Sequence, residues 1–129
     1  SRLKELAFGE IEGLTHEEAR ERGLPSQFDE GWPVRGAESI ADFEARVQGA
    51  VRELSQTAQG KVAVVAHGGV ARPFFPHIFK RHTADIWFNM KLHNVCGVLF
   101  SIKDDDRYCL EAFNLAPEEI IARSSSTCP

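Results

Sequence analysis

A chain of 129 residues has the size of one domain, and we expect residues 1–129 to form a single one. Hydrophobic residues make up 43% and charged residues 26%, which is typical of a soluble globular protein. The net charge of −4 argues against nucleic acid or an anionic membrane as a partner, because both favour a basic protein face. The three cysteines lack zinc-site spacing and favour reduced thiols in a cytoplasmic protein; they are Cys96, Cys109 and Cys128.

The first part of the chain combines an irregular loop with a short helix. Residues 3–13 follow no helical or strand period, and their two glycines among acidic residues predict an ordered loop. Such a loop often carries function, although a solvated acidic loop is the alternative. Thr15 and Glu18 have the spacing of a capping box, which predicts a short helix that stops at Gly23. Residues 24–38 then form a connecting loop.

The clearest helix of the sequence begins after Ser39. Ser39 and Asp42 form an acidic variant of the capping box, and the helix is expected to end near Ala58. Apolar residues recur at three- and four-residue steps and predict one buried stripe: Ile40, Phe43, Val47, Ala50, Val51 and Leu54. Arg46 and Arg52 lie off this stripe, and we expect both to be solvated.

A short apolar run ends in a histidine and two glycines. Residues 62–66 are rich in β-branched side chains and predict a buried strand. His67, Gly68 and Gly69 follow, and the glycines predict a sharp turn that leaves bare N–H groups at the start of the next helix. A histidine beside a helix N-terminus is well placed to meet an anion. The alternative is a histidine that caps the strand and bonds to a nearby carbonyl, and the local sequence does not separate the two.

The remaining segments predict a helix and a hairpin. Residues 70–80 have a broad apolar face, and Pro76 predicts a bend or an irregular stretch within them. Residues 95–102 and 108–113 suit two antiparallel strands. The three aspartates at 104–106 lack the glycine and distal glutamate of a calcium loop and predict a solvated hairpin tip.

Three motifs and one asparagine carry a family resemblance. They are L-K-E-L-A-F-G-E-I-E-G at residues 3–13, G-A-E-S at 36–39, V-V-A-H-G-G-V-A-R at 64–72, and Asn94 before the next strand. In their order and spacing they resemble the loop, helix start and strand–turn motifs of the histidine phosphatase superfamily, in its phosphoglycerate-mutase-like branch. The resemblance spans most of the chain.

The resemblance implies an α/β fold with a particular gap. It implies part of a three-layer α/β/α sandwich, whose mixed sheet has helices on both faces and whose central N-terminal strand is missing. Without that strand, the segment 62–66 would expose an apolar edge, which is a pairing hazard. We therefore expect this chain to be the C-terminal portion of a larger protein, or to pair with another chain or with a second copy of itself.

The resemblance also implies a phosphoryl-transfer site. In the family one histidine attacks phosphorus, a second histidine and arginines hold the phosphate oxygens, and a glutamate protonates the leaving oxygen. Glu5 matches that acid and His67 matches the second histidine. The residues implied to bind the phosphate of the substrate are Gly68, Gly69, Arg72 and Asn94. The chemistry requires no metal or other cofactor, and the ligand would be a small phosphorylated substrate or inorganic phosphate.

One part of the family pattern is absent from these residues. The R-H-G motif of the nucleophile has no match, since Arg81-His82-Thr83 lacks both the glycine and a preceding strand. We therefore expect a phosphatase in the complete protein and no turnover from this chain alone. A non-catalytic phosphate-binding or dimerising module is the alternative from another class. A phosphoglycerate-type mutase is a third, which the short stretch at 14–38 disfavours.

Overall fold

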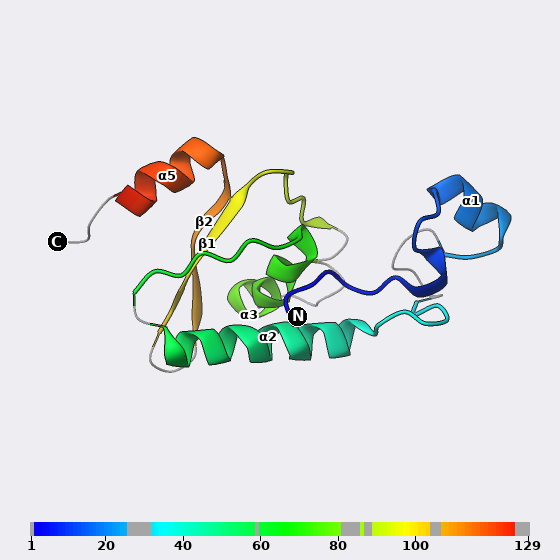
Figure 1. Cartoon of the computed structure of the whole chain (residues 1–129), viewed down its shortest axis with the longest axis horizontal. Helices are drawn as coiled ribbons and strands as arrows, with labels where there is room; N and C mark the ends of the chain where they lie inside the picture. Colours follow the sequence, from blue (N-terminus) through cyan, green and yellow to red (C-terminus); the bar gives the residue numbers. More distant parts are fainter. Residues whose placement is uncertain are drawn as a thin grey trace. The chain divides into compact units, whose positions relative to one another are not determined.

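The computed structural model describes residues 2–25, 32–58, 60–80, 86, 89–103 and 107–125. The chain forms two compact units, Ser1–Val70 and Ala71–Pro129. The elements in chain order are η1 (Gly9–Ile11), α1 (His16–Glu21), α2 (Ile40–Thr57), η2 (Gly68–Phe74), α3 (Phe75–Phe79), β1 (Gly97–Ile102), β2 (Tyr108–Leu115) and α5 (Pro117–Ser125) (Figure 1). None of the described helices is both long enough and apolar enough to cross a bilayer.

The capping box at the start of α1 is confirmed in both directions. The hydroxyl of Thr15 accepts a hydrogen bond from the backbone N–H of Glu18 at 3.2 Å, and the Glu18 carboxylate accepts from the N–H of Thr15 at 2.7 Å. That second bond is the main reason why the pKa of Glu18 lies below its ordinary value. Gly23 follows with φ +68°, as the predicted stop requires.

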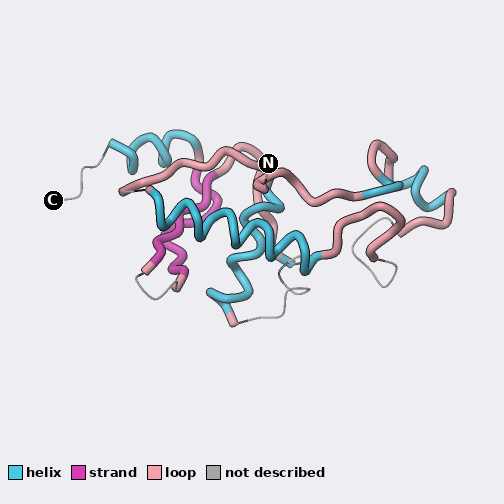
Figure 2. Tube along the Cα trace, turned by 60° about the horizontal axis from the view of Figure 1, so that its bottom comes forward, coloured by secondary structure: helices cyan, strands magenta, loops and turns pink. Residues whose placement is uncertain are grey.

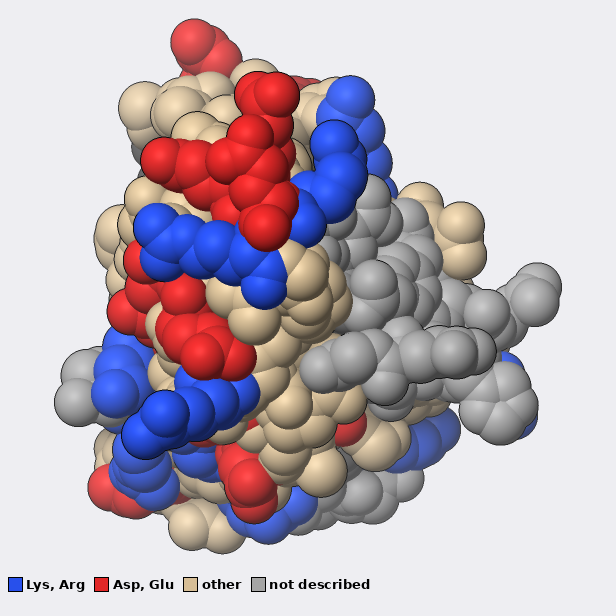
Figure 3. Space-filling model, turned by 90° about the vertical axis from the view of Figure 1, so that its right-hand side faces the viewer, with Lys and Arg blue, Asp and Glu red and all other residues tan. Residues whose placement is uncertain are grey.

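Acidic and basic side chains alternate on the face of the molecule that carries α1 (Figure 3).

Helix α2 also begins and ends close to the predicted residues. The Ser39 hydroxyl accepts from the N–H of Asp42 at 3.0 Å, and Ala58 caps the other end. Phe43 and Val47 of the predicted stripe are fully buried, and Ala50 is nearly so. The apolar periodicity of residues 40–54 therefore predicted correctly which face of α2 is buried.

Two glycines join the first loop to the segment before α2. Phe8 and Ala37 form an isolated antiparallel bridge, and Gly9 lies at φ +60°. A Cβ atom on Gly9 would approach the carbonyl carbon of Gly36 to 2.7 Å, so no other residue fits there without movement of the backbone. The backbone N–H of Glu38 donates to the carbonyl of Ala7 at 2.9 Å. The ordered loop predicted at the N-terminus is thus held against the start of α2.

The strand predicted at 62–66 does not form. These residues are neither helix nor strand, and Figure 2 draws them as loop. Val62 and Val64 are about half exposed, and Val65 is fully exposed. A β-strand is stabilised through its ladder of interstrand hydrogen bonds, and the described residues provide no neighbouring strand for this segment. The exposed valines agree with the expectation that an unpaired segment here would present an apolar edge.

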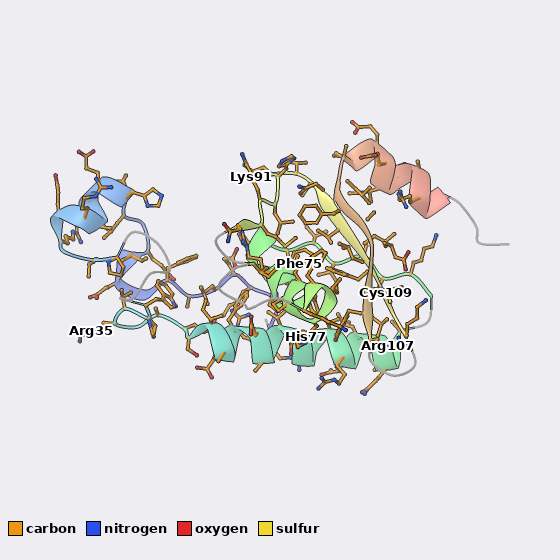
Figure 4. The ribbon with its side chains drawn as sticks, turned by 180° about the vertical axis from the view of Figure 1, so that it is seen from behind. Arg35, Phe75, His77, Lys91, Arg107 and Cys109 are labelled. Carbon is orange, nitrogen blue, oxygen red and sulfur yellow. The ribbon has the colours of Figure 1, made fainter. Side chains whose placement is uncertain are left out.

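The expected mixed sheet is likewise not found among the described residues. They contain one two-stranded antiparallel sheet, in which β1 pairs with β2 and the register shifts on either side of Leu99. Helix α3 packs on this hairpin through Phe75, which lies between them and contacts Phe100 and Phe113 (Figure 4). This aromatic cluster is the core of the second unit.

The helix predicted at 70–80 is interrupted, as its prolines suggested. It consists of the 3-10 turn η2 followed by α3, and Pro76 lies in the first turn of α3, where its missing N–H is tolerated. Cys96 and Cys109 are free thiols. The pair Arg81-His82, the aspartates at 104–106 and Cys128 lie outside the described residues.

Candidate functional site

The carboxylate of Glu5 meets the turn that follows His67. Its Oε2 atom accepts a hydrogen bond from the backbone N–H of Gly69 at 3.3 Å, and its Oε1 atom accepts from the N–H of Leu6 at 2.9 Å. Leu6 is almost fully buried and anchors the chain next to Glu5. The structure therefore brings together two segments that the family resemblance had singled out separately.

The Glu5 carboxyl group lies very close to the Cα atom of Gly69. The backbone there needs no left-handed conformation, but a Cβ atom would lie 2.8 Å from the carboxyl carbon of Glu5 and closer still to one of its oxygens. Any side chain at this position would displace the carboxylate. The sequence predicted a turn for the glycine pair; the structure adds that the Glu5 carboxylate occupies the space of a Cβ atom at Gly69.

His67 and Gly68 lie in the same turn and face solvent. Both are exposed, whereas Gly69 beside them is buried. The backbone carbonyl of His67 accepts from the N–H of Val70 at 3.1 Å, which closes the first turn of η2. The imidazole is thus available to a ligand at the start of a helical turn, within two residues of the Glu5 contact.

Arg72 and Asn94 belong to the second unit. Arg72 donates from Nη1 to the carbonyl of Ile86 at 3.3 Å. Asn94 lies on an exposed turn. The side chain of Asn114 holds that turn, because it accepts from the N–H of His93 at 3.0 Å and donates to the carbonyl of Lys91 at 3.1 Å. Of the predicted site residues, the structure joins Glu5 to Gly69, with His67 and Gly68 in the same turn.

The prediction that Arg46 is solvated was wrong. Arg46 and Glu38 form an ion pair in which both side chains are only 17% exposed, with Nε to Oε1 at 2.5 Å and Nη2 to Oε2 at 2.7 Å. This paired hydrogen bonding lowers the pKa of Glu38 and raises that of Arg46. The guanidinium also lies over the ring of Phe43, 4.7 Å from its centroid. The helical stripe could not reveal this, but an acid in the motif at 36–39 followed by an arginine two turns into the helix was an available signal.

No metal site is evident where the structure can be described. Within the described ranges, no three residues among His, Cys, Asp and Glu gather so that they could hold a metal ion. The local chemistry is that of a carboxyl group, an imidazole and backbone N–H donors. Such a set can donate a proton and stabilise an anion.

Comparison with solved structures shows the fold. The chain is 25% identical to mycobacterial hydrolase 1, with a TM-score of 0.72, and 26% identical to a mycobacterial glucosyl-3-phosphoglycerate phosphatase in complex with VO3, with a TM-score of 0.69. It is 20% identical to YhfR of Bacillus stearothermophilus, with a TM-score of 0.74. Each match covers 89% of this chain, but only 62%, 63% and 59% of the respective structures.

The family is shown by a match over most of the sequence. No curated protein matches the chain significantly. The family model described as histidine phosphatase superfamily (branch 1) matches residues 1–115. Because that match covers far more than half of the chain and the solved structures share its fold, the protein belongs to branch 1 of the histidine phosphatase superfamily.

Proposed function

We propose that the complete protein hydrolyses phosphate monoesters through a phosphohistidine, with Glu5 as the general acid and His67 as the histidine that stabilises the transferring phosphoryl group. The observation that carries this proposal is the contact between the Glu5 carboxylate and the N–H of Gly69. It unites the acid and the histidine turn in one place. Family membership supports the reaction class, and one similar structure is that of a phosphatase in complex with VO3.

The chemistry assigns a separate task to each group. As the bond from phosphorus to the leaving oxygen breaks, the proton of Glu5 passes to that oxygen. The resulting Glu5 carboxylate is stabilised by the hydrogen bonds that it accepts from the N–H groups of Leu6 and Gly69. The imidazole of His67, at the start of η2, supplies an N–H donor for the equatorial oxygens.

The nucleophilic histidine is proposed to lie outside these 129 residues. No described histidine follows a strand in an R-H-G context, and the chain spans 59–63% of the length of the structures it matches. Arg72 and Asn94 are the further residues of this chain that we propose to contact the phosphate. The substrate class is a small phosphate monoester.

The experiment is a phosphatase assay with an alkyl phosphate, whose poor leaving group needs a proton donor, carried out on the native protein with whatever segments accompany this chain. We expect Glu5→Gln and His67→Ala to lower kcat/KM by about 10²–10⁴-fold, the usual contribution of a positioned acid or base. His16→Gln, at an exposed position of α1, is the control and should retain full activity. Activity that survives both site substitutions would refute the assignment. Phosphate binding without turnover in the native protein would favour the non-catalytic module.

A further inference from the structure

Arg46 uses every N–H donor of its guanidinium within the first unit. Nε and one N–H of Nη2 bind Glu38, as described above. The other donors bind three backbone carbonyls of the N-terminal segment: Nη1 donates to Arg2 at 2.8 Å and to Lys4 at 2.9 Å, and Nη2 donates to Glu5 at 2.9 Å. A guanidinium has five N–H donors, so none is left over for a ligand.

Glu38 binds the same N-terminal segment at Ala7. Its backbone N–H donates to the carbonyl of Ala7 at 2.9 Å, and its Oε2 atom accepts from the N–H of Ala7 at 3.5 Å. Glu38 therefore holds Ala7 while Arg46 holds the carbonyl of Glu5. The Cα atom of Glu5 lies between two of the carbonyls that Arg46 holds, those of Lys4 and Glu5, and the Glu5 carboxylate reaches Gly69.

We propose that Arg46, oriented by Glu38, is a positioning residue for Glu5: it fixes the backbone of the N-terminal segment so that the Glu5 carboxylate stays at the N–H of Gly69. The geometric part stands on the hydrogen bonds alone, whereas its importance for catalysis rests on the proposed function. Lysine cannot replace arginine here, because one ammonium group cannot reach a carboxylate and three carbonyls that surround a planar fork. Arg46 is also predicted not to bind phosphate, since its donors are occupied.

The first test needs no enzymatic activity. Amide hydrogen exchange is measured by NMR in the native protein and in its Arg46→Lys variant. We expect the amides of Leu6 and Gly69 to exchange at least about tenfold faster in the variant, while the amides of Val47 and Ala50 inside α2 keep their rates. Arg52→Lys, an exposed position on the same helix, is the matched control and should change neither set.

The second test uses the native protein in the phosphatase assay. Misplacement of a general acid by about 1 Å can lower the rate about 100-fold, so we expect Arg46→Lys to lower kcat by about 10–100-fold. KM and the inhibition constant of inorganic phosphate should stay within about twofold, because the interaction that is lost makes no contact with substrate. If Arg46→Lys does not fold, Glu38→Gln retains the arginine and the shape of its partner, and should show the same pattern more weakly.

The two hypotheses fail in different ways. Unchanged exchange at Gly69 in both Arg46→Lys and Glu38→Gln would overturn the positioning role, whatever the activity. A weaker inhibition by phosphate with unchanged kcat would also overturn it, because that result identifies a phosphate ligand. Faster exchange at Gly69 in a native protein without phosphatase activity would uphold the positioning role and refute the proposed function.

Discussion

The carboxylate of Glu5 and the backbone N–H of Gly69 are hydrogen-bonded at 3.3 Å, although 64 residues separate them in the sequence. This contact joins the N-terminal loop to the turn that holds His67. A side chain at position 69 would force the Glu5 carboxylate to move. The effects of single substitutions on the stability of the protein can be predicted from this and the other contacts.

Gly69→Ala should destabilise the protein. The added methyl group would overlap the Glu5 carboxyl group, which would have to swing away and lose its hydrogen bond with the N–H of residue 69, at a net cost of about 0.5–1.5 kcal/mol. Gly49→Ala is the matched control: it lies inside α2, where a Cβ atom meets nothing within 4 Å, and should raise the free energy of unfolding by about 0.5–1 kcal/mol. Urea unfolding measures both changes. Equal effects of the same sign would contradict the close approach at Gly69.

The Glu38–Arg46 pair predicts a pH dependence of stability. The pKa of Glu38 is lowered in the folded state by its hydrogen bonds with Arg46. Its contribution is therefore fully present above the unfolded pKa of about 4.3 and is lost as the pH falls through the lower, folded value. Glu38→Gln should be less stable than the wild type near neutral pH, and the difference should shrink below about pH 4.

The control for this pH dependence is Glu53→Gln. Glu53 pairs with Arg2, but both side chains are more than half exposed, and such surface pairs contribute about 0–1 kcal/mol. Urea unfolding of the three proteins across this pH range makes the comparison. A stability difference for Glu38→Gln that is the same at every pH would contradict the charge pairing.

The hydroxyl of Ser39, which caps the N-terminus of α2, should stabilise the protein more than the hydroxyl of Ser55 within the helix. Ser39 accepts the N–H of Asp42 at 3.0 Å and donates to its carboxylate at 2.6 Å. Ser39→Ala should lower the free energy of unfolding by about 1 kcal/mol. Ser55→Ala removes only a bond to the carbonyl of Arg52 within the same helix, and should change it by less than about 0.5 kcal/mol. Thermal and urea unfolding measure both; a larger loss for Ser55→Ala would argue against the cap.

The aromatic core of the second unit depends on Phe75. This ring is fully buried against Phe100 and Phe113, so Phe75→Leu should lower the free energy of unfolding and Phe75→Ala should do so by about 3–5 kcal/mol. Phe79 in the same helix is 44% exposed, and its replacement by alanine should have a clearly smaller effect. Near-UV circular dichroism during unfolding reports the loss of this packing. A matching effect at Phe79 would show that the cluster is assigned to the wrong face of α3.

The sequence predicted several elements that local rules determine, but not helix α5, whose cap between Ala116 and Glu119 is also local. Helices α1 and α2 follow from the caps at Thr15 and Ser39 and from one apolar stripe, all of which depend on residues within a few turns. The hairpin β1–β2 was predicted because its two strands are adjacent in sequence.

The other failures concern interactions between distant segments. Residues 62–66 have the composition of a strand, but a strand also requires a pairing partner, which its own sequence cannot specify. Arg46 lies off the apolar stripe and was therefore predicted to be solvated. The period of a helix cannot predict its hydrogen bonds with backbone carbonyls of residues 2–5. For the same reason the motif identified Glu5 and Gly69 but not the hydrogen bond between them.

The most direct test of the central claim, that Glu5 is the general acid of the proposed phosphatase, is the dependence of the rate on the leaving group in the native protein, with and without Glu5→Gln. General acid assistance is needed for a poor leaving group such as an alkoxide and is nearly dispensable for a nitrophenolate. The account predicts that Glu5→Gln loses about 10²–10⁴-fold with alkyl phosphates and far less with p-nitrophenyl phosphate. An equal loss with both substrates, or no loss with alkyl phosphates, would show that Glu5 is not the proton donor.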